Sequence, residues 1–231
     1  MGDVHCVKYC GREYQNHFVD ANKMVCVGYN VERKVEDMML TRLACYLIAQ
    51  NGDPRKDEIA FAQNYFAMQT RRFENLEKRI SDSERVLARH KLTETEKELS
   101  GVIFRQTGND KNFGLIRSNG DKALFGFTTS EMKYRLKIPA SRALADFQPT
   151  IILKAKDFAT EITIFNIKAK SLMLEKQISV EHITNNKRVR KTLIERGIKP
   201  ELLPKEDDIK KIEKKIMNDD KKTLDKPDGL S

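Results

Sequence analysis

After Pro54, the chain contains no glycine or proline up to Lys91, so neither of the two residues that most disfavour a helix interrupts this segment. Apolar residues recur in it at every seventh position: Ile59, Phe66, Phe73, Ile80 and Leu87. A seven-residue period is typical of helices that pack along a seam, within one chain or between two copies. The segment therefore predicts one long helix that joins two domains. A homodimer through the Ile59–Leu87 helix and packing within the chain both remain open.

The sequence before this helix predicts a β-hairpin and a shorter helix. Val25, Val27, Val31, Arg33 and Val35 lie at alternating positions on both sides of a turn at Gly28-Tyr29-Asn30. A helix is expected over about 39–50, ending at Asn51-Gly52 with Gly52 in the left-handed conformation. Asp53 is then expected to cap the long helix, and Pro54 to be its first residue.

The residues after Lys91 predict further short helices. Thr93-Glu94-Thr95-Glu96 is a capping box, which predicts a new helix from there to about 105. Asn119-Gly120 is typical of a hairpin turn, and a second capping box at Thr128 predicts a short helix that Pro139 closes. Two longer helices are expected over 149–170 and from Ser179 to Gly197.

These elements predict a mainly α-helical fold with a small β-hairpin (α+β), in two domains joined by the long helix. The expected parts are residues 1–92, with the hairpin and the helical arm, and residues 93–204, a basic and mainly helical domain. Residues 205–231 are expected to be a charged and partly disordered tail, with one helix around Ile209, Ile212 and Ile216.

The net charge of +9 is concentrated in one part of the chain. Residues 101–196 hold 18 Lys and Arg against 9 Asp and Glu, whereas the segments on either side are balanced. A basic region between neutral flanks is typical of a module that binds a polyanion. DNA is therefore an expected partner, with single or double strands undecided.

Three basic clusters are the candidate nucleic-acid contacts, although a solvated surface is the alternative for each. They comprise Arg55, Lys56, Arg71 and Arg72; Lys133 and Arg135; and Lys187, Arg188, Arg190 and Lys191. Arg55 and Lys56 are expected in the first turn of the long helix, where positive charge opposes the helix dipole. The stretch around Lys133 also has a weak helix-turn-helix pattern.

No catalytic residue, metal site or cofactor is expected. His5, Cys6, Cys10 and His17 lie close together in the sequence, but their spacing fits no usual zinc pattern. The Glu213-x-Lys215 pair has the letters of a metal-dependent nuclease motif, but it lies in the helical tail. A cryptic nuclease is therefore the weakest of the functional alternatives.

Two features point to a cytoplasmic protein. The longest apolar run, Leu43–Ala49, is far shorter than a bilayer span. Residues 1–30 carry charges throughout and do not have the pattern of a signal peptide.

Several blocks of the sequence resemble one bacterial family. HFVDANKMV (17–25) and LTRLACYLIAQNGDPRKDEIAFAQNYFAMQTRR (40–72) resemble the BRO-type N-terminal domain of the DNA-damage-inducible protein D family. KLTETEKELSGVIF (91–104), TTSEMKYRL (128–136) and NNKRVRKTLIERGIKPELLP (185–204) are similar to its second half. The resemblance covers roughly residues 16–216.

The resemblance implies a non-enzymatic protein of the DNA-damage (SOS) response that binds DNA or modulates a RecA-type recombinase filament. A protein–protein interaction module or inhibitor without direct DNA contact is the alternative. The stretch MGDVHCVKYCGREYQN is short and unlike the family, so a BRO-like domain shortened at its N-terminus is expected. Association with the nucleoid would follow from DNA binding.

Overall fold

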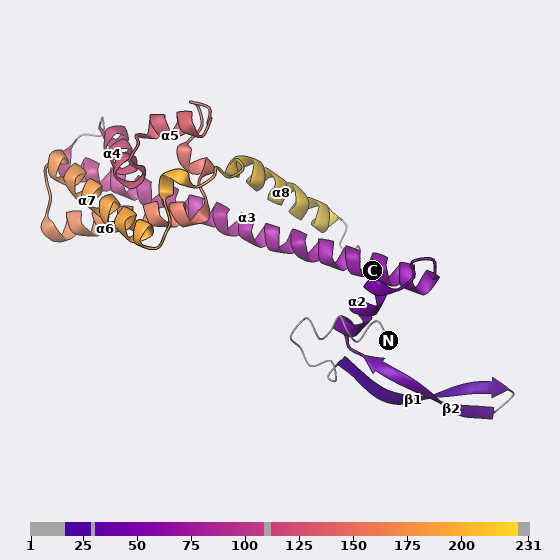
Figure 1. The fold of residues 1–231 in the computed structure, drawn as a ribbon. Helices are drawn as coiled ribbons and strands as arrows, with labels where there is room; N and C mark the ends of the chain where they lie inside the picture. The colour runs from indigo at the N-terminus through magenta and orange to yellow at the C-terminus, as the bar shows by residue number, and fades with distance from the viewer. Residues whose placement is uncertain (1–16, 29–30, 109–111, 226–231) are drawn as a thin grey trace. The chain divides into compact units, whose positions relative to one another are not determined.

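A computed structural model describes residues 17–28, 31–108 and 112–225, with side chains up to Lys221. The long helix α3 runs from Asp57 to Thr107, and the other elements are short by comparison (Figure 1). By their internal contacts, the residues form two compact units, Met1–Glu77 and Lys78–Ser231. The fold is mainly α-helical with one hairpin, as expected. The expected three-part division at residues 92 and 204 stays a prediction.

Unit 1 contains the hairpin, the helix α2 and the beginning of α3. Strands β1 (Phe18–Gly28) and β2 (Val31–Leu40) pair antiparallel, with Phe18 opposite Leu40, which confirms the expected hairpin. Helix α2 (Arg42–Asn51) is capped by the Thr41 hydroxyl, which accepts a bond from the Ala44 amide at 3.4 Å.

The junction between α2 and α3 differs from its prediction. Gly52 has φ −78°, so it is not left-handed; a Cβ there would lie 2.7 Å from Ile59 Cδ1, and close packing therefore favours glycine. Asp53 accepts a bond from the Arg55 amide at 3.0 Å in a local turn, and α3 begins only at Asp57. Arg55 and Lys56 consequently precede the first turn of α3, and the Lys56 carbonyl oxygen accepts the Ala60 amide at 2.9 Å. Their positive charges still lie beside the positive end of the helix dipole.

The expected new helix at Thr93 is wrong, because α3 continues through it without a break. The Thr93 hydroxyl donates to the Arg89 carbonyl oxygen at 2.9 Å, and Glu96 pairs with Arg117 at 2.8 Å. Leu92 and Leu99 are fully buried on the same helix. Tertiary packing on both sides of the capping box therefore keeps the helix continuous.

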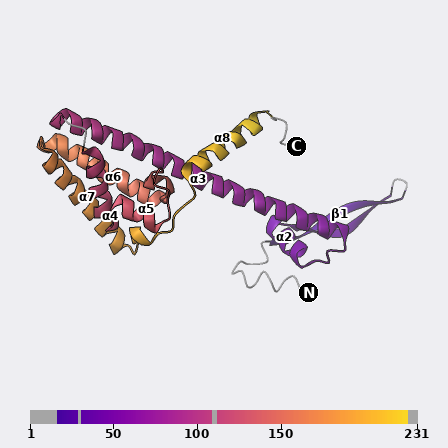
Figure 2. The ribbon, with the colours of Figure 1, turned by 90° about the horizontal axis from the view of Figure 1, so that it is seen from above.

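Unit 2 is a helical bundle on the C-terminal half of α3 (Figure 2). Its elements after α3 are α4 (Phe113–Phe125), α5 (Thr129–Arg135), η2 (Leu144–Phe147), α6 (Thr150–Lys170), α7 (Glu175–Glu195), η3 (Pro200–Leu202) and α8 (Ile209–Asp225). Fully buried Leu124, Phe125 and Ile152 form one part of its core, and Leu99, Ile167 and Ile178 form another.

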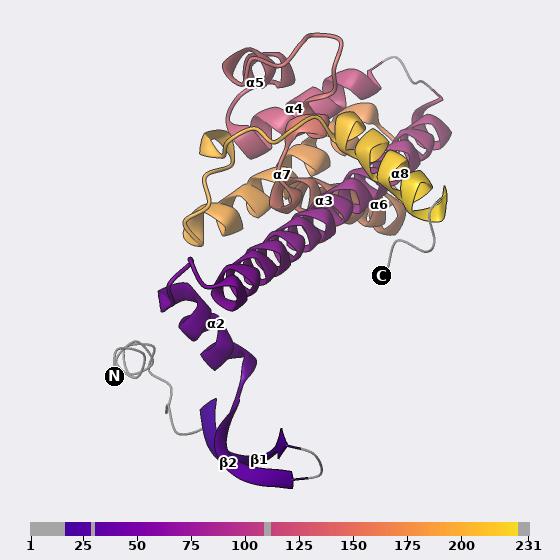
Figure 3. The same ribbon diagram turned by 90° about the vertical axis from the view of Figure 1, so that its right-hand side faces the viewer.

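Two predicted motifs of unit 2 are not formed. Asn119-Gly120 lies inside α4 and is not a hairpin turn. A Cβ on Gly120 would lie 2.3 Å from His182 Nε2, so the glycine permits close approach of α7. The Thr128 capping box is confirmed at the start of α5, which lies beside α4 (Figure 3). The expected second helix of the motif, however, is only the four-residue 3-10 helix η2. The helix-turn-helix pattern is therefore wrong.

Candidate nucleic-acid interface

The positive charge of the chain belongs to unit 2. Residues 78–231 carry 33 Lys and Arg against 23 Asp and Glu, whereas residues 1–77 carry 10 against 11. The long-range attraction of a polyanion therefore acts on unit 2.

The basic cluster of α7 divides into outward and inward side chains. Lys187, Arg188 and Lys191 are exposed. On a helix with 3.6 residues per turn, these three positions fall within an arc of about 100°. They are named the α7 basic face below. Its three cations can contact the phosphates of one backbone.

Arg190 lies outside this arc and is committed to an internal contact. Its Nη1 and Nη2 atoms each lie 2.9 Å from a carboxylate oxygen of Glu201, and Nη1 also donates to the Leu124 carbonyl oxygen at 2.5 Å. The hydrogen bonds from Arg190 lower the pKa of Glu201 below its ordinary value. The two-pronged pair joins α7 to η3 and the end of α4.

The two α5 cations are held by local contacts. The Lys133 ammonium donates to the Ala140 carbonyl oxygen at 3.0 Å, and the Arg135 guanidinium lies 4.3 Å from the ring centroid of Phe127. Tyr134 between them is 87% exposed. An exposed ring beside two cations is a suitable surface for stacking an unpaired base, although stacking on it is a prediction.

The four cations of unit 1 lie in two places. Arg55 is exposed in the turn before α3, with Nε 3.1 Å from Asp53 Oδ1, and its hydrogen bonds lower the pKa of that carboxyl. Lys56 beside it is exposed. Arg71 and Arg72 lie further along α3, where they line two neighbouring grooves.

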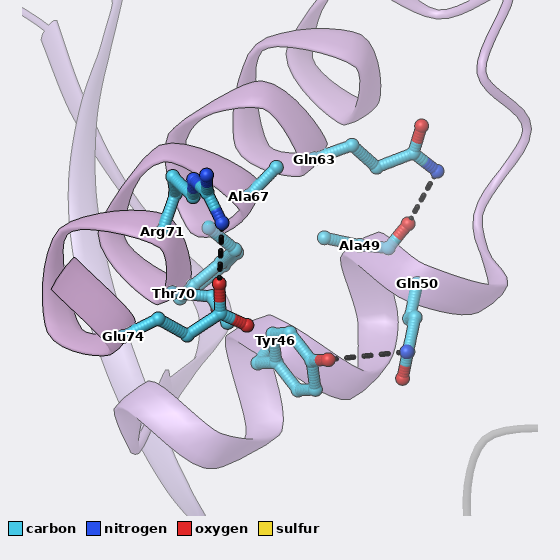
Figure 4. A pocket seen from close by; sticks show the side chains of 9 residues that line it. Tyr46, Ala49, Gln50, Gln63, Ala67, Thr70, Arg71 and Glu74 are labelled. Carbon is cyan, nitrogen blue, oxygen red and sulfur yellow. Dashed lines mark hydrogen bonds and ion pairs between the residues drawn. The ribbon is translucent and has the colours of Figure 1, made fainter. Parts of the chain in front are cut away.

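The first groove, of about 570 Å³, lies between α2 and α3 (Figure 4). Arg71 pairs with Glu74 at 3.2 Å at one end of it, and Gln63 donates to the Ala49 carbonyl oxygen at 2.8 Å. The second, of about 700 Å³, is lined by Arg42, Leu43, Tyr46, Phe66, Gln69, Thr70, Arg72, Phe73 and Leu76. We name the two together the α2–α3 groove.

Sequence reasoning did not select Tyr46, and it named Phe66 and Phe73 of this groove only for their heptad spacing. Tyr46 and Phe66, which line both parts, meet edge to face with ring centroids 5.2 Å apart. The Arg42 guanidinium lies 5.9 Å from the Tyr65 ring centroid. The four-residue spacing of Arg42, Tyr46 and Gln50 places them on one face of α2, and this signal was available in the sequence.

A group of polar side chains is buried between α4, α6 and α7. Lys156 Nζ lies 2.6 Å from Asp121 Oδ1, and His182 Nδ1 lies 3.2 Å from the Thr163 hydroxyl. Burial, reinforced by the nearby Lys156 charge, lowers the pKa of His182 from 6.5 to about 4. The imidazole is therefore neutral near pH 7 and acts as a packed, hydrogen-bonded core residue.

The remaining chemical candidates are placed as follows. Glu213, the carboxylate of the Glu213-x-Lys215 pair, has its Oε1 2.8 Å from His90 Nε2, in an ion pair or hydrogen bond. Within the described ranges, no three His, Cys, Asp or Glu side chains are arranged to hold a metal ion. His5, Cys6 and Cys10 lie outside those ranges. No helix in the described part of the chain could span a membrane.

Comparisons with known proteins agree with the division of the chain. A family model described as the DinD C-terminal domain matches residues 80–212, which lie in unit 2. The protein named "DNA damage-inducible protein D" of Escherichia coli (strain K12) is 31% identical over 222 residues. This alignment covers 92% of the chain and 81% of the relative. The chain therefore belongs to the DNA damage-inducible protein D family.

Proposed function

We propose that this protein acts in the DNA-damage (SOS) response by binding DNA, without catalysing a reaction. The observation that carries the proposal is the α7 basic face, Lys187, Arg188 and Lys191, on the unit that holds the whole charge excess. These side chains extend from a helix whose inward side is fixed by the Arg190–Glu201 pair. We place the protein in the cytoplasm, where DNA binding would hold a fraction of it on the nucleoid.

Phosphate contact predicts a defined dependence on salt. Each phosphate that a cation neutralises contributes a slope of about −0.9 for duplex DNA, or about −0.7 for single strands, to log K against log salt. Loss of all three cations should therefore make the slope less steep by about 2 to 3.

The test measures fluorescence anisotropy of labelled single-stranded and duplex oligonucleotides with the full chain over a salt series. The variant is Lys187→Ala/Arg188→Ala/Lys191→Ala. The matched control, Lys210→Ala/Lys211→Ala/Lys214→Ala, removes the same charge from exposed positions of α8. The α7 variant should bind more weakly with a shallower slope, and the control should stay close to the wild type. Equal slopes for all three proteins, or no binding at low salt, would refute the proposal.

A protein partner for unit 1 is the second candidate, because its net charge offers little attraction to a polyanion while its α2–α3 groove is lined by Tyr46, Phe66 and Ala67. The resemblance to a BRO-type domain and its family makes a RecA-type recombinase filament the partner to examine. Binding of the filament in the α2–α3 groove would allow the protein to regulate recombination without any contact between unit 1 and DNA.

This second candidate has its own test. Ala67→Glu places a charge in the α2–α3 groove, and Asn64→Glu places the same charge on an exposed position that does not line it. Co-sedimentation with recombinase filaments should be lost with Ala67→Glu and kept with Asn64→Glu. Equal co-sedimentation of both variants would exclude the groove as the docking site.

The absence of catalysis is also open to measurement. Plasmid DNA incubated with the protein and Mg²⁺ or Mn²⁺ should remain intact. Cleavage that disappears in Glu213→Ala would instead establish the nuclease alternative.

A further inference from the structure

The outer face of the α3–α6 pair has features that DNA binding does not use. Lys91 on α3 pairs with Glu161 on α6 at 2.9 Å, and Glu98 pairs with Lys168 at 2.9 Å. Both pairs join residues that are 70 positions apart. From one pair to the other, the position advances by seven residues on both helices, so the two helices run in the same direction. We call each of these ion pairs between α3 and α6 a rung. All four residues belong to unit 2.

Large apolar side chains surround these ion pairs. Ile151, Phe158 and Phe165 recur every seven residues along α6 and are 45%, 58% and 69% exposed. Leu87 is 69% exposed on α3, one helical turn before Lys91. Phe165 lies between Glu161 and Lys168 along the helix, so it is flanked by both rungs. A stripe of this size on one face is typical of a protein contact, whereas single exposed apolar residues are ordinary.

The four charges alternate in sign over this face. On α3 the order is Lys91 then Glu98, and on α6 it is Glu161 then Lys168. Consider a second copy related by a two-fold axis that is perpendicular to both helices and lies in the plane of contact. Each rung of one copy then lies opposite the other rung of the second copy. Lys91 of one copy then faces Glu98 of the other, and Glu161 faces Lys168. The face is thus complementary in charge to itself.

We propose that this face binds a second copy of the chain, with the α3–α6 pairs antiparallel across the two-fold axis. Phe165 lies near the axis in this arrangement and packs against its counterpart, while Phe158 and Leu87 cover the flanks. The balanced charges do not attract a phosphate backbone, and the exposed phenylalanines lose water only against another apolar surface. Antiparallel packing also places opposite ends of the helix dipoles side by side, which the parallel alternative does not.

The apolar contact is tested by sedimentation equilibrium of the full chain without DNA. The wild type should reach twice the 26.7 kDa mass of one chain as concentration rises. Phe165→Lys should remain a monomer, while the exposed control Tyr134→Lys, also in unit 2, should dimerise like the wild type. Ile80→Lys on the α3 heptad should dimerise as well. A monomeric wild type, or a dimer that withstands Phe165→Lys, would overturn the proposal.

The orientation is tested by exchanging charges within each rung. Lys91→Glu/Glu161→Lys keeps the ion pair within the chain, but in a dimer of this variant residues 91 and 98 of opposite copies carry like charges, as do residues 161 and 168. Glu98→Lys/Lys168→Glu has the same effect through the other rung. Each double variant alone should therefore dimerise more weakly than the wild type. A mixture of the two restores opposite charges at every contact and should form a heterodimer. If both variants self-associate as strongly as the wild type, the antiparallel arrangement is excluded.

Discussion

The guanidinium of Arg190 and the carboxylate of Glu201 form a two-pronged ion pair in which both contacts are 2.9 Å. Their side chains are 22% and 18% exposed, whereas Lys187 on the preceding turn of α7 is exposed to solvent. One run of basic residues, Lys187–Lys191, therefore combines a structural cation with three exposed cations, of which Lys191 lies 3.8 Å from the exposed Glu195 carboxylate.

Arg190→Ala should lower the free energy of unfolding by about 1–3 kcal/mol, because it leaves Glu201 and the Leu124 carbonyl oxygen without their donor. Lys187→Ala should change it by less than about 0.5 kcal/mol, because no internal contact is lost. Urea denaturation of both variants measures the difference. Equal destabilisation would show that the inward role of Arg190 is wrong.

Gly120→Ala should destabilise the protein by about 1–3 kcal/mol, since the added methyl overlaps the His182 ring. Gly114 lies on the same helix with open space around its Cβ position. Gly114→Ala should therefore be neutral or stabilise by up to about 1 kcal/mol. Thermal unfolding of the two variants provides the comparison, and a neutral Gly120→Ala would contradict the close approach of α4 and α7.

The buried His182 should make stability depend on pH. Its folded pKa of about 4 lies below the 6.5 of the unfolded chain, so the unfolded state binds the proton more readily. The contribution of His182 is complete above pH 6.5 and decreases as pH falls toward 4, by about 3 kcal/mol in total.

Urea midpoints measured between pH 7 and 5 check this dependence, because most carboxylates stay ionised there. His182→Gln removes the titrating group and should flatten the profile. A steep profile in His182→Gln would assign the dependence to another group.

Arg85→Lys should cost about 2–3 kcal/mol, although it preserves the charge. Arg85 is 5% exposed and donates to the carbonyl oxygens of Asp146, Gln148 and Asp207 at 2.9, 3.0 and 2.6 Å. One ammonium group cannot reach the same three acceptors as the planar guanidinium, so carbonyl oxygens remain unsatisfied. Chemical denaturation should show almost no effect of Arg105→Lys, an exposed substitution on the same helix.

Local chemistry was sufficient to predict several elements. The alternating valines gave the hairpin, and the Thr128–Glu131 capping box gave the start of α5, because both signals act over a few residues. The capping box at Thr93 failed because Leu92 and Leu99 are buried by other helices, which favours an unbroken α3. Gly120 was misread as a turn residue because its partner, His182, is 62 positions away in the sequence.

The same limit applies to the candidate sites. The basic residues of α7 were visible in the sequence, but the inward direction of Arg190 depends on Glu201 in another element. The α2–α3 groove and the alternating charges of the α3–α6 face arise only when two helices are side by side. Periodicity identifies which residues share one face of a helix, but it does not tell which other helix packs against that face.

The hairpin of β1 and β2 exposes nearly all of its described side chains, including Val27 and Met39. The backbone amides of the two strands are therefore protected from solvent by little more than the hydrogen bonds between the strands. A two-stranded ribbon by itself is only marginally stable. In deuterated buffer these amides should exchange far sooner than those of Leu99 or Ile152 in the bundle. The ribbon is therefore the part of the described chain where slowed isotope uptake would most readily report that a partner has bound.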